Sequence, residues 1–299
     1  MQSRAWLLDA SIYIFRAWFA LPDRWHTAEG RPTNAVLGYA GFLLQLLPKL
    51  GDNAHLAAAF DESLGSCFRT RIFPDYKCSR VLPDEDLAFQ LATCREVTEM
   101  LGLPCYGGPE FEADDYLATL ARVNREAGHA VTLISRDKDL GQLLHAGDEI
   151  WDVAANQRVD LAAFTERFEV SPAQFVDFQA LVGDRMDDIP GVPGVGPRSA
   201  AQLLRHFGNL NVLEEHLNQV AELPIRGARG LQQRLIAHWP QVRVSQQLAR
   251  LECGVPGVQP LPRWRPQRER LLALGSRLSE LGSGDRLPAQ CEKLARELA

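Results

Sequence analysis

The amino-acid sequence predicts an α/β fold, with a mainly parallel sheet flanked by helices, followed by a smaller helical domain. In the first half of the chain, short apolar runs that suit buried strands alternate with segments of helical periodicity. Strands that alternate with helices form parallel sheets covered on both faces, which defines the class. After about residue 170 the strand signals fade and helical patterns remain, so we expect a second, helical domain there.

The predicted elements follow one another in a regular order. Strands are expected at AWLLDA, HLAAAFD, AVTLIS and EIWDV, and helices over residues 33–50, 84–101, 113–127 and 160–168. The cluster PGVPGVGP at 190–197 breaks the helical part of the chain. These patterns predict an α/β domain over 1–175 and a helical domain over 176–260, and they leave 261–299 as a basic tail without a predicted place.

The composition of the 299 residues is that of a soluble globular protein, with 46% hydrophobic and 23% charged residues. Asp9 and Arg16 interrupt the N-terminal apolar stretch, which argues against a signal peptide, and no apolar run is long enough to span a bilayer. The six cysteines form neither a CxxC pair nor a zinc spacing. We therefore expect reduced thiols in a cytoplasmic protein.

The charge is unevenly distributed along the chain. The net charge is −6, whereas the residues from 225 to the C-terminus carry 13 Lys and Arg against 6 Asp and Glu. The N-terminal part is therefore acidic. Ordinary surface variation would explain this, and so would an acidic cleft whose local sign is reversed by a bound divalent metal.

Carboxylates recur where the predicted strands end. Asp9 follows AWLL, Asp61 follows HLAAAF, and Asp137 and Asp139 follow AVTLIS. Because ligands bind outside the carboxyl ends of the strands in an open α/β sheet, these acids should meet at one edge.

Further acids stand at two helix boundaries. The segment FEADDYLATLA places Glu112, Asp114 and Asp115 at the start of a helix, and Asp184 and Asp187 lie where the helical domain begins. Each acid alone would suit a helix cap or a first helical turn. Together, so many like charges cannot share a cleft unless cations neutralise them. Oxygen ligands without His or Cys select Mg²⁺ or Mn²⁺, and two such ions form the usual clamp for phosphodiester hydrolysis.

The segment CFRTRIFPDYKCSR, residues 67–80, mixes cations with aromatic rings. It carries Arg69, Arg71, Lys77 and Arg80, with Phe68, Phe73 and Tyr76 between them. Such a mixture suits phosphates and unstacked bases. A solvated helix with a few buried aromatics would give the same pattern, and this segment alone does not decide between the two.

The glycine-rich segment GVPGVGPRSAAQLL, residues 191–204, is more specific. Two turns bounded by Gly lead into a helix N-terminus, which exposes backbone N–H groups to an anion. This is the pattern of a helix-hairpin-helix, which grips a duplex backbone without reading its sequence. A structural Gly/Pro loop is the alternative. The residues expected to contact DNA are Gly191, Val192, Gly194, Val195, Gly196, Arg198 and Ser199.

Taken together, these motifs resemble the 5′-nuclease family, which comprises flap endonucleases and the 5′→3′ exonuclease domain of bacterial DNA polymerase I. The matching pieces are LLDASIYIFRAWFALP, GRPTNAVLGY, AAFDES, FRTRIFPDYKCSR, FEADDYLATLA, LISRDKDLGQLL and GDRMDDIPGVPGVGPRSAAQLL, in the family order over residues 6–204. The resemblance implies a PIN-like nuclease core, a helical arch over about 67–95, and a helical domain that contains the helix-hairpin-helix. The chain is similar to the stand-alone bacterial members.

The resemblance also implies roles for individual residues. It places the family's metal carboxylates on Asp9, Asp61, Glu112, Asp114, Asp115, Asp137, Asp139, Asp184 and Asp187. It implies that Arg69, Lys77 and Arg80 hold the scissile phosphate, and that Arg16 and Tyr76 contact the substrate strand and its end. It further implies two Mg²⁺ ions in the cleft, with Mn²⁺ as an alternative, and a K⁺ ion held by backbone carbonyls near 191–196.

The sequence therefore predicts a metal-dependent 5′-nuclease that acts, as a monomer, on DNA with a free 5′ end or a 5′ flap. No Walker loop and no GxGxxG occurs, so no nucleotide cofactor is expected, and no membrane is involved. Three other functions remain open: a non-catalytic structure-specific DNA-binding protein, a PIN-type ribonuclease, and a small-molecule phosphohydrolase with Asp9 as nucleophile. The complete set of carboxylates, the hairpin motif and the absence of other catalytic arrangements favour the nuclease.

Overall fold

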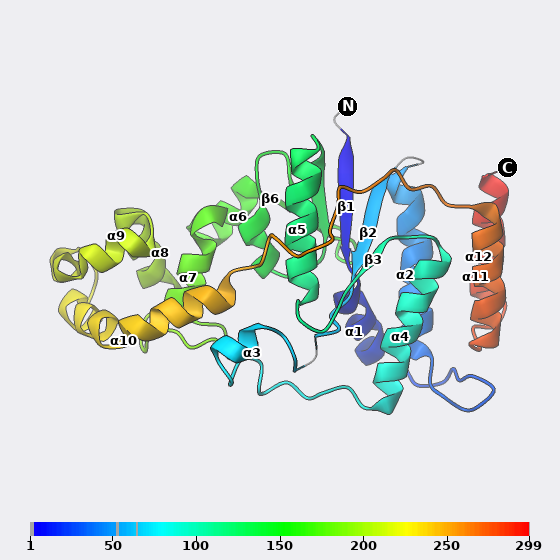
Figure 1. Cartoon of the computed structure of the whole chain (residues 1–299), viewed down its shortest axis with the longest axis horizontal. Coiled ribbons are helices and arrows are strands. Elements are labelled where there is room, and N and C mark those ends of the chain that lie inside the picture. The colour runs from blue at the N-terminus through cyan, green and yellow to red at the C-terminus, as the bar shows by residue number, and fades with distance from the viewer. Residues whose placement is uncertain (1–2, 52–53, 64, 299) are drawn as a thin grey trace.

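A mixed sheet forms the centre of the first domain (Figure 1). The computed structural model describes residues 3–51, 54–63 and 65–298. Within these residues the sheet has six strands in the order β3-β2-β1-β4-β5-β6. The strands are β1 (Arg4–Asp9), β2 (His55–Ala59), β3 (Cys105–Tyr106), β4 (Ala130–Ile134), β5 (Glu149–Asp152) and β6 (Gln157–Asp160). All neighbours pair in parallel except β5 and β6, which are antiparallel.

The four strands predicted from apolar runs are confirmed. No sequence pattern predicted β3, which has only two residues, or β6, whose residues are mostly exposed. Both lie at the edges of the sheet, where a strand is not buried on both faces and its sequence need not be apolar.

Helices cover both faces of the sheet. The helices of this domain are α1 (Ala10–Ala20), α2 (Asn34–Leu50), α3 (Arg69–Ile72), α4 (Glu85–Met100), α5 (Ala113–Glu126) and α6 (Leu161–Phe168). Alternation along β1 separates the two faces: Leu7 packs in one core with α5, and Leu8 packs in the other with α1, α2 and α4. The core on the α5 side continues into the helical domain without a break.

The helical domain lies at the far end of the molecule from α2 and α4 (Figure 1). It comprises η2 (Pro172–Gln174), α7 (Phe175–Val182), α8 (Pro197–Phe207), α9 (Leu210–Glu215), η3 (Leu217–Glu222) and α10 (Ala228–Ala249). A 3₁₀ turn of the first domain, η1 (Asp139–Leu143), lies between β4 and β5 in the chain and packs against η2 and α7. Among the described residues, no helix is both long enough and apolar enough to cross a membrane.

The C-terminal residues return to the first domain. After α10 the chain runs back along it, and α11 (Arg268–Glu280) and α12 (Arg286–Glu297) stand beside α2 and α4 (Figure 1). The indole of Trp264 donates to the Leu101 carbonyl at 3.2 Å, and Leu274 and Cys291 are buried in the core that contains α2. The segment for which the sequence predicted no place is thus a helical pair that closes one core.

Candidate functional site

Three adjacent strands deliver carboxylates to one edge of the sheet, as the sequence predicted. Asp9 is the last residue of β1, Asp61 follows the end of β2, and Asp137 follows the end of β4. Since β2, β1 and β4 are neighbours in the sheet, the three acids lie side by side. Asp114, in the first turn of α5, interacts electrostatically with both Asp9 and Asp137.

A chain of hydrogen bonds orders part of this edge. Asp9 caps α1 by accepting from the Ile12 amide, and its other oxygen accepts from the Ser135 hydroxyl at 2.8 Å. The Ser135 oxygen accepts from the Asp137 amide at 3.0 Å, and Asp137 accepts from the Asp139 amide at 2.9 Å. No sequence pattern predicted a role for Ser135, which is fully buried and hydrogen-bonds to Asp9 and to the Asp137 amide.

Four carboxylates in this group lack a cationic hydrogen-bond partner within the described chain: Asp9, Asp61, Asp114 and Asp137. Burial, together with the charges of Asp137 and Asp61, raises the pKa of Asp9 to about 7. Burial also raises the pKa of Asp114 well above its usual range, with added repulsion from Asp137 and Asp9. One of these carboxylates, Asp9, is buried and the other three are half-buried. A set of oxygen ligands that repel one another in this way fits a hard divalent cation.

The carboxylates do not yet surround a single point. No three His, Cys, Asp or Glu side chains in the described ranges stand close enough together to hold a metal ion as they are. A change of side-chain rotamers would therefore accompany ion binding. Cations of the protein itself neutralise the remaining predicted carboxylates.

Arg69 lies among these acids but is not available to a phosphate, contrary to prediction. Its side chain is 1% exposed, and its Nη1 and Nη2 atoms contact Glu112 at 3.0 Å and Asp115 at 2.7 Å. Its remaining donors bond to the backbone carbonyls of Leu248 and Arg250. Since every nitrogen of the guanidinium already has a partner, Arg69 serves as an internal anchor.

Asp115 likewise does not fit its predicted role as a metal ligand. Both of its oxygens accept from Arg69, one also accepts from the Glu112 amide at 3.0 Å, and the other accepts from the Glu252 amide at 2.8 Å. Glu112 and Asp115 form a capping box at the start of α5. Asp115 therefore caps the helix, as acids at a helix start often do. The side chain of Asp114 makes no hydrogen bond within the described residues.

Residues 67–84, which we call the cover segment, lie over the acids. Tyr76 is 5% exposed and donates to Glu112 at 2.9 Å, so its ring does not offer the predicted DNA contact. Lys77 contacts Glu112 and lies 3.6 Å from Asp187. Arg80, 46% exposed, contacts Asp187 at 2.6 Å. Lys77 and Arg80 are therefore the predicted phosphate contacts that lie at the mouth of the site.

The rest of the predicted arch has a different environment. From Glu85 onward it belongs to α4, whose Gln90 is fully buried and donates to Asn34 at 3.0 Å. The Gln90 oxygen also accepts from the backbone amide of Ala35 at 2.7 Å. Residues 85–95 thus pack against α2 as part of the core, and the cover segment ends at residue 84.

Lys138 was missed by the sequence reasoning. Its Nζ atom lies 3.0 Å from Asp139 and 2.5 Å from Asp184, so it bridges two predicted metal ligands. Gln179 of α7 donates to the same Asp139 at 2.8 Å. The available signal was the position of Lys138 between Asp137 and Asp139 in the sequence, where a cation is flanked by two carboxylates.

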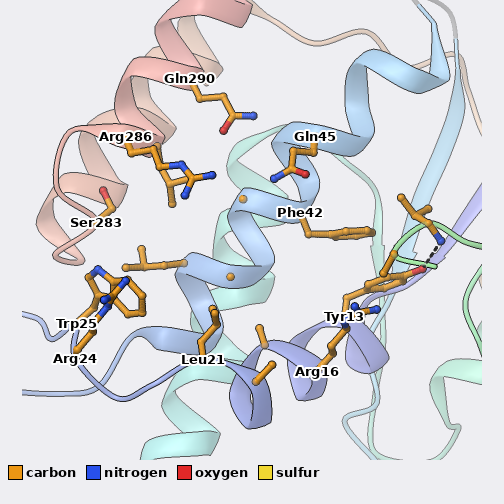
Figure 2. Close-up of a pocket in the computed structure, with 18 of the residues that line it drawn as sticks. Tyr13, Arg16, Leu21, Arg24, Trp25, Phe42, Gln45, Ser283, Arg286 and Gln290 are labelled. Carbon is orange, nitrogen blue, oxygen red and sulfur yellow. Dashed lines mark hydrogen bonds between the residues drawn. The ribbon is translucent and has the colours of Figure 1, made fainter. Parts of the chain in front are cut away.

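Arg16 does not face the carboxylates. It lies on α1 and lines a cavity of about 560 Å³ between α1, α2 and the start of α12 (Figure 2). Figure 2 shows Arg16 and Tyr13 at one end of this cavity, and Arg24 and Trp25 at another. None of the nine predicted carboxylates lines it.

The predicted hairpin joins α7 to α8. Gly191 passes so close to Val182 that a Cβ atom there would lie 2.2 Å from the Val182 carbonyl oxygen. Val192 and Val195 are 3% and 5% exposed, so their side chains hold the hairpin to the core and do not face a ligand. Gly194, Gly196 and Arg198 are exposed, Ser199 is half-buried, and Pro197 begins α8.

An α/β core with carboxylates at its strand ends, joined to a helical domain, defines a class of nucleases that cleave phosphodiesters. Residues 4–169 match the family described as 5'-3' exonuclease, N-terminal resolvase-like domain, and residues 170–269 match 5'-3' exonuclease, C-terminal SAM fold. The chain belongs to this 5′-3′ exonuclease family.

Curated relatives of the chain are DNA polymerases. DNA polymerase I of Pseudomonas aeruginosa is 39% identical over 272 residues, which cover 90% of this chain and 30% of the relative. The thermostable DNA polymerase I of Thermus aquaticus is 34% identical over 284 residues, 94% of this chain and 32% of the relative. The chain thus spans about a third of the length of these relatives.

Solved structures share the fold over almost the whole chain. A T5 5'-exonuclease with bound divalent zinc ions has a TM-score of 0.67 at 20% identity and covers 98% of this chain and 99% of its own. The catalytic core of Rad2 in complex with a DNA substrate has a TM-score of 0.63 at 17% identity and covers 98% and 92%.

Proposed function

We propose that this chain is a structure-specific 5′-nuclease that hydrolyses phosphodiester bonds of DNA near a free 5′ end or at a 5′ flap. The observation that carries the proposal is a set of carboxylates without a cationic hydrogen-bond partner in the described chain, at the ends of three adjacent strands and the start of α5: Asp9, Asp61, Asp114 and Asp137. Family membership and the DNA-bound Rad2 structure of the same fold support it.

The four carboxylates would hold the first divalent ion, and Asp139, Asp184 and Asp187 would hold the second. We take both to be Mg²⁺, with Mn²⁺ as a substitute, because carboxylate oxygens suit these ions. When bound, such ions supply an activated hydroxide and stabilise the charge on the leaving oxygen. Asp115 is not in our set, since both of its oxygens are engaged by Arg69.

The cover segment would position the scissile phosphate. Lys77 and Arg80 carry their charges at the mouth of the site, and Arg80 is half-exposed. A phosphate that enters would compete with Glu112 and Asp187 for these cations, so the segment would shift its partners as substrate binds. Tyr76, Arg69 and Glu112 would stay in place and orient the segment from below.

The hairpin at 183–196 would grip the duplex part of the substrate. Its exposed Gly194 and Gly196 permit a close approach of the backbone, and Arg198 adds a charge beside the N-terminus of α8. A K⁺ ion held by hairpin carbonyls belongs to this proposal. We also propose limits for the parts of the chain. The cover segment spans residues 67–84, the helical domain spans about 170–250, and the residues after 250 return to the first domain.

A labelled 5′-flap duplex tests the function. We expect release of the flap with Mg²⁺, and no cleavage in EDTA. A matched flapped duplex made of RNA should be cut more slowly, because the hairpin would grip a DNA duplex and an RNA helix has a different backbone geometry. Binding of the flap without any cleavage in Mg²⁺ would indicate a non-catalytic DNA-binding protein, and preference for the RNA flap would indicate a ribonuclease.

A further inference from the structure

Lys138 lies where a cation shared by Asp139 and Asp184 would lie. Its Nζ atom is 3.0 Å from an oxygen of Asp139 and 2.5 Å from an oxygen of Asp184. The two acids come from different elements, since Asp139 begins η1 and Asp184 follows α7. Because Mg²⁺ binds oxygens at about 2.0–2.1 Å, an ion held by both carboxylates would take the space of the ammonium group. The ion and the ammonium therefore exclude each other.

The two proposed metal-ion sites thus differ in the metal-free protein, because a cation of the chain occupies only one of them. At Asp9, Asp61, Asp114 and Asp137 no ammonium or guanidinium group of the described chain donates a hydrogen bond. At Asp139 and Asp184 a cation of the chain is already present. The Lys138 ammonium group thus occupies the position between the Asp139 and Asp184 carboxylates.

We propose that Lys138 is a tethered counter-ion, which fills the Asp139–Asp184 place in the free protein and must leave before a second divalent ion binds there. This inference rests on the proposed function, since it concerns the second of the two ions. It means that the free protein binds one divalent ion much more tightly than the next. It also assigns Lys138 as a positioning residue that governs the second ion.

A cavity beside Lys138 could accept its ammonium group after displacement. The Lys138 side chain is 40% exposed and borders a cavity of about 370 Å³ between the carboxylates and the start of α8. Arg167 and Arg198 line the same cavity. A DNA strand that passed from the cleft to the hairpin would bring phosphates to these cations. Binding of the second ion would then raise the affinity for DNA, because the released ammonium group could contact a phosphate. Binding of DNA would raise the affinity for the second ion by the same factor.

Binding of Mn²⁺ to the full chain without DNA tests the inference directly. Free Mn²⁺ is measured by electron paramagnetic resonance during titration of the wild type, Lys138→Met and the control Lys293→Met, which changes a lysine on the exposed face of α12. We expect Lys138→Met to bind the second ion on the order of tenfold more tightly, and the control to match the wild type. Lys138→Gln provides a second neutral variant if the methionine variant does not fold.

Equal affinity for the second ion in the wild type and the neutral variants would overturn the inference. That result would leave the proposed function intact if the wild type still cleaves the 5′ flap with Mg²⁺. Failure of the wild type to bind any Mn²⁺ and to cleave the flap would instead overturn the proposed function itself.

Duplex binding separates a displaced counter-ion from an ordinary phosphate contact. In EDTA, where Lys138 stays on the two acids, the wild type and Lys138→Met should bind a 5′-flap duplex equally. In Ca²⁺, which is expected to support binding without efficient cleavage, the wild type should gain more affinity than the variant. A loss in the variant of the same size under both conditions would mean that Lys138 is a fixed phosphate contact, and would contradict the inference.

Discussion

Arg69 and Asp115 form a doubly hydrogen-bonded ion pair that is almost completely removed from solvent. Nη1 donates to one carboxylate oxygen at 2.8 Å and Nη2 to the other at 2.7 Å, and the side chains are 1% and 0% exposed. The same guanidinium reaches carbonyls at the end of α10, and Asp115 accepts from the Glu252 amide. One pair thus joins the cover segment, α5 and the end of the helical domain.

Breaking this pair should destabilise the protein strongly. Arg69→Met leaves Asp115 buried without its countercharge, and the loss of one partner of a buried pair costs about 3–5 kcal/mol. Urea unfolding followed by circular dichroism measures the free energy of unfolding. The control is Arg71→Met, whose ion pair with Glu110 is 65% and 53% exposed and should contribute at most about 1 kcal/mol. Similar losses in the two variants would show that burial does not set the importance of the pair.

Asp114→Asn should separate catalysis from folding. The substitution keeps the shape but removes a charge that burial and its neighbours disfavour, so the metal-free protein should be at least as stable at pH 8 as the wild type. The rate of flap cleavage in Mg²⁺ should fall about a hundredfold or more. Removing a group that only hydrogen-bonds to a metal ligand already costs about 10–100-fold, and the loss of a ligand should cost at least as much. Asp86→Asn, at an exposed position of α4, is the control and should change neither quantity. Wild-type turnover in Asp114→Asn would contradict a role in ion binding.

Stabilisation by Mg²⁺ should depend on pH in a definite direction. The pKa of Asp9 and that of Asp139 are each raised to about 7, in both cases chiefly by burial. Between the unfolded pKa and 7 the folded state holds more protons than the unfolded state, so the metal-free protein loses stability as the pH rises through this range. Protons compete with the ion for the same oxygens.

The increase in melting temperature caused by Mg²⁺ should therefore be small at pH 5.5 and grow towards pH 8. Differential scanning fluorimetry at matched ionic strength measures it, with NaCl in place of MgCl₂ as the control. A constant increase across this range would mean that the titrating carboxylates do not bind the ion.

Two glycines of the hairpin should respond differently to substitution. A Cβ atom at Gly196 would have no neighbour within 4 Å, and the backbone there has φ −97°, so Gly196→Val should fold normally. It should nevertheless weaken duplex binding in Ca²⁺ similarly for all sequences, because the branched side chain would keep a phosphate away. Fluorescence anisotropy with several duplexes measures this. A loss limited to one sequence would argue against a backbone contact.

Gly191→Ala serves as the contrasting variant. Its Cβ atom would lie 2.2 Å from a backbone oxygen, so this change should lower the melting temperature and not only the affinity. Gly194 is a poorer site for the test, since its φ of +73° would strain any side chain regardless of DNA.

The sequence predicted the carboxylates at the sheet edge because topology alone places them there. Asp9, Asp61 and Asp137 follow apolar runs, and the ends of neighbouring parallel strands must meet. It could not predict which acids would be neutralised by the protein's own cations. Arg69 is a basic residue in a basic segment, and only the packing of α10 against α3 shows that it is buried. The same limit applies to Lys138, whose partner Asp184 lies 46 residues away.

The position of α11 and α12 could not be predicted for a related reason. Their apolar stripes show that they are helices with a buried face, but nothing in those residues says which surface they cover. That surface belongs to α2 and α4. Some residues of the motifs that suit DNA are instead buried in the protein. The ring of Tyr76 and the side chains of Val192 and Val195 are examples.

The return of the chain after α10 makes the helical domain an insertion in the nuclease domain. The polypeptide leaves the first domain after α6, through η2 and α7, and comes back at Ala249 and Leu251, both of which bond to Gln142 of η1 in the first domain. The outgoing and returning segments both lie against η1, and two connections resist twisting of one domain against the other better than a single linker does. The domain that would hold the duplex therefore cannot rotate freely about the domain that would cut it. The distance from a duplex held by the hairpin to the carboxylates would then vary little, and this distance would select the phosphodiester bond that is hydrolysed.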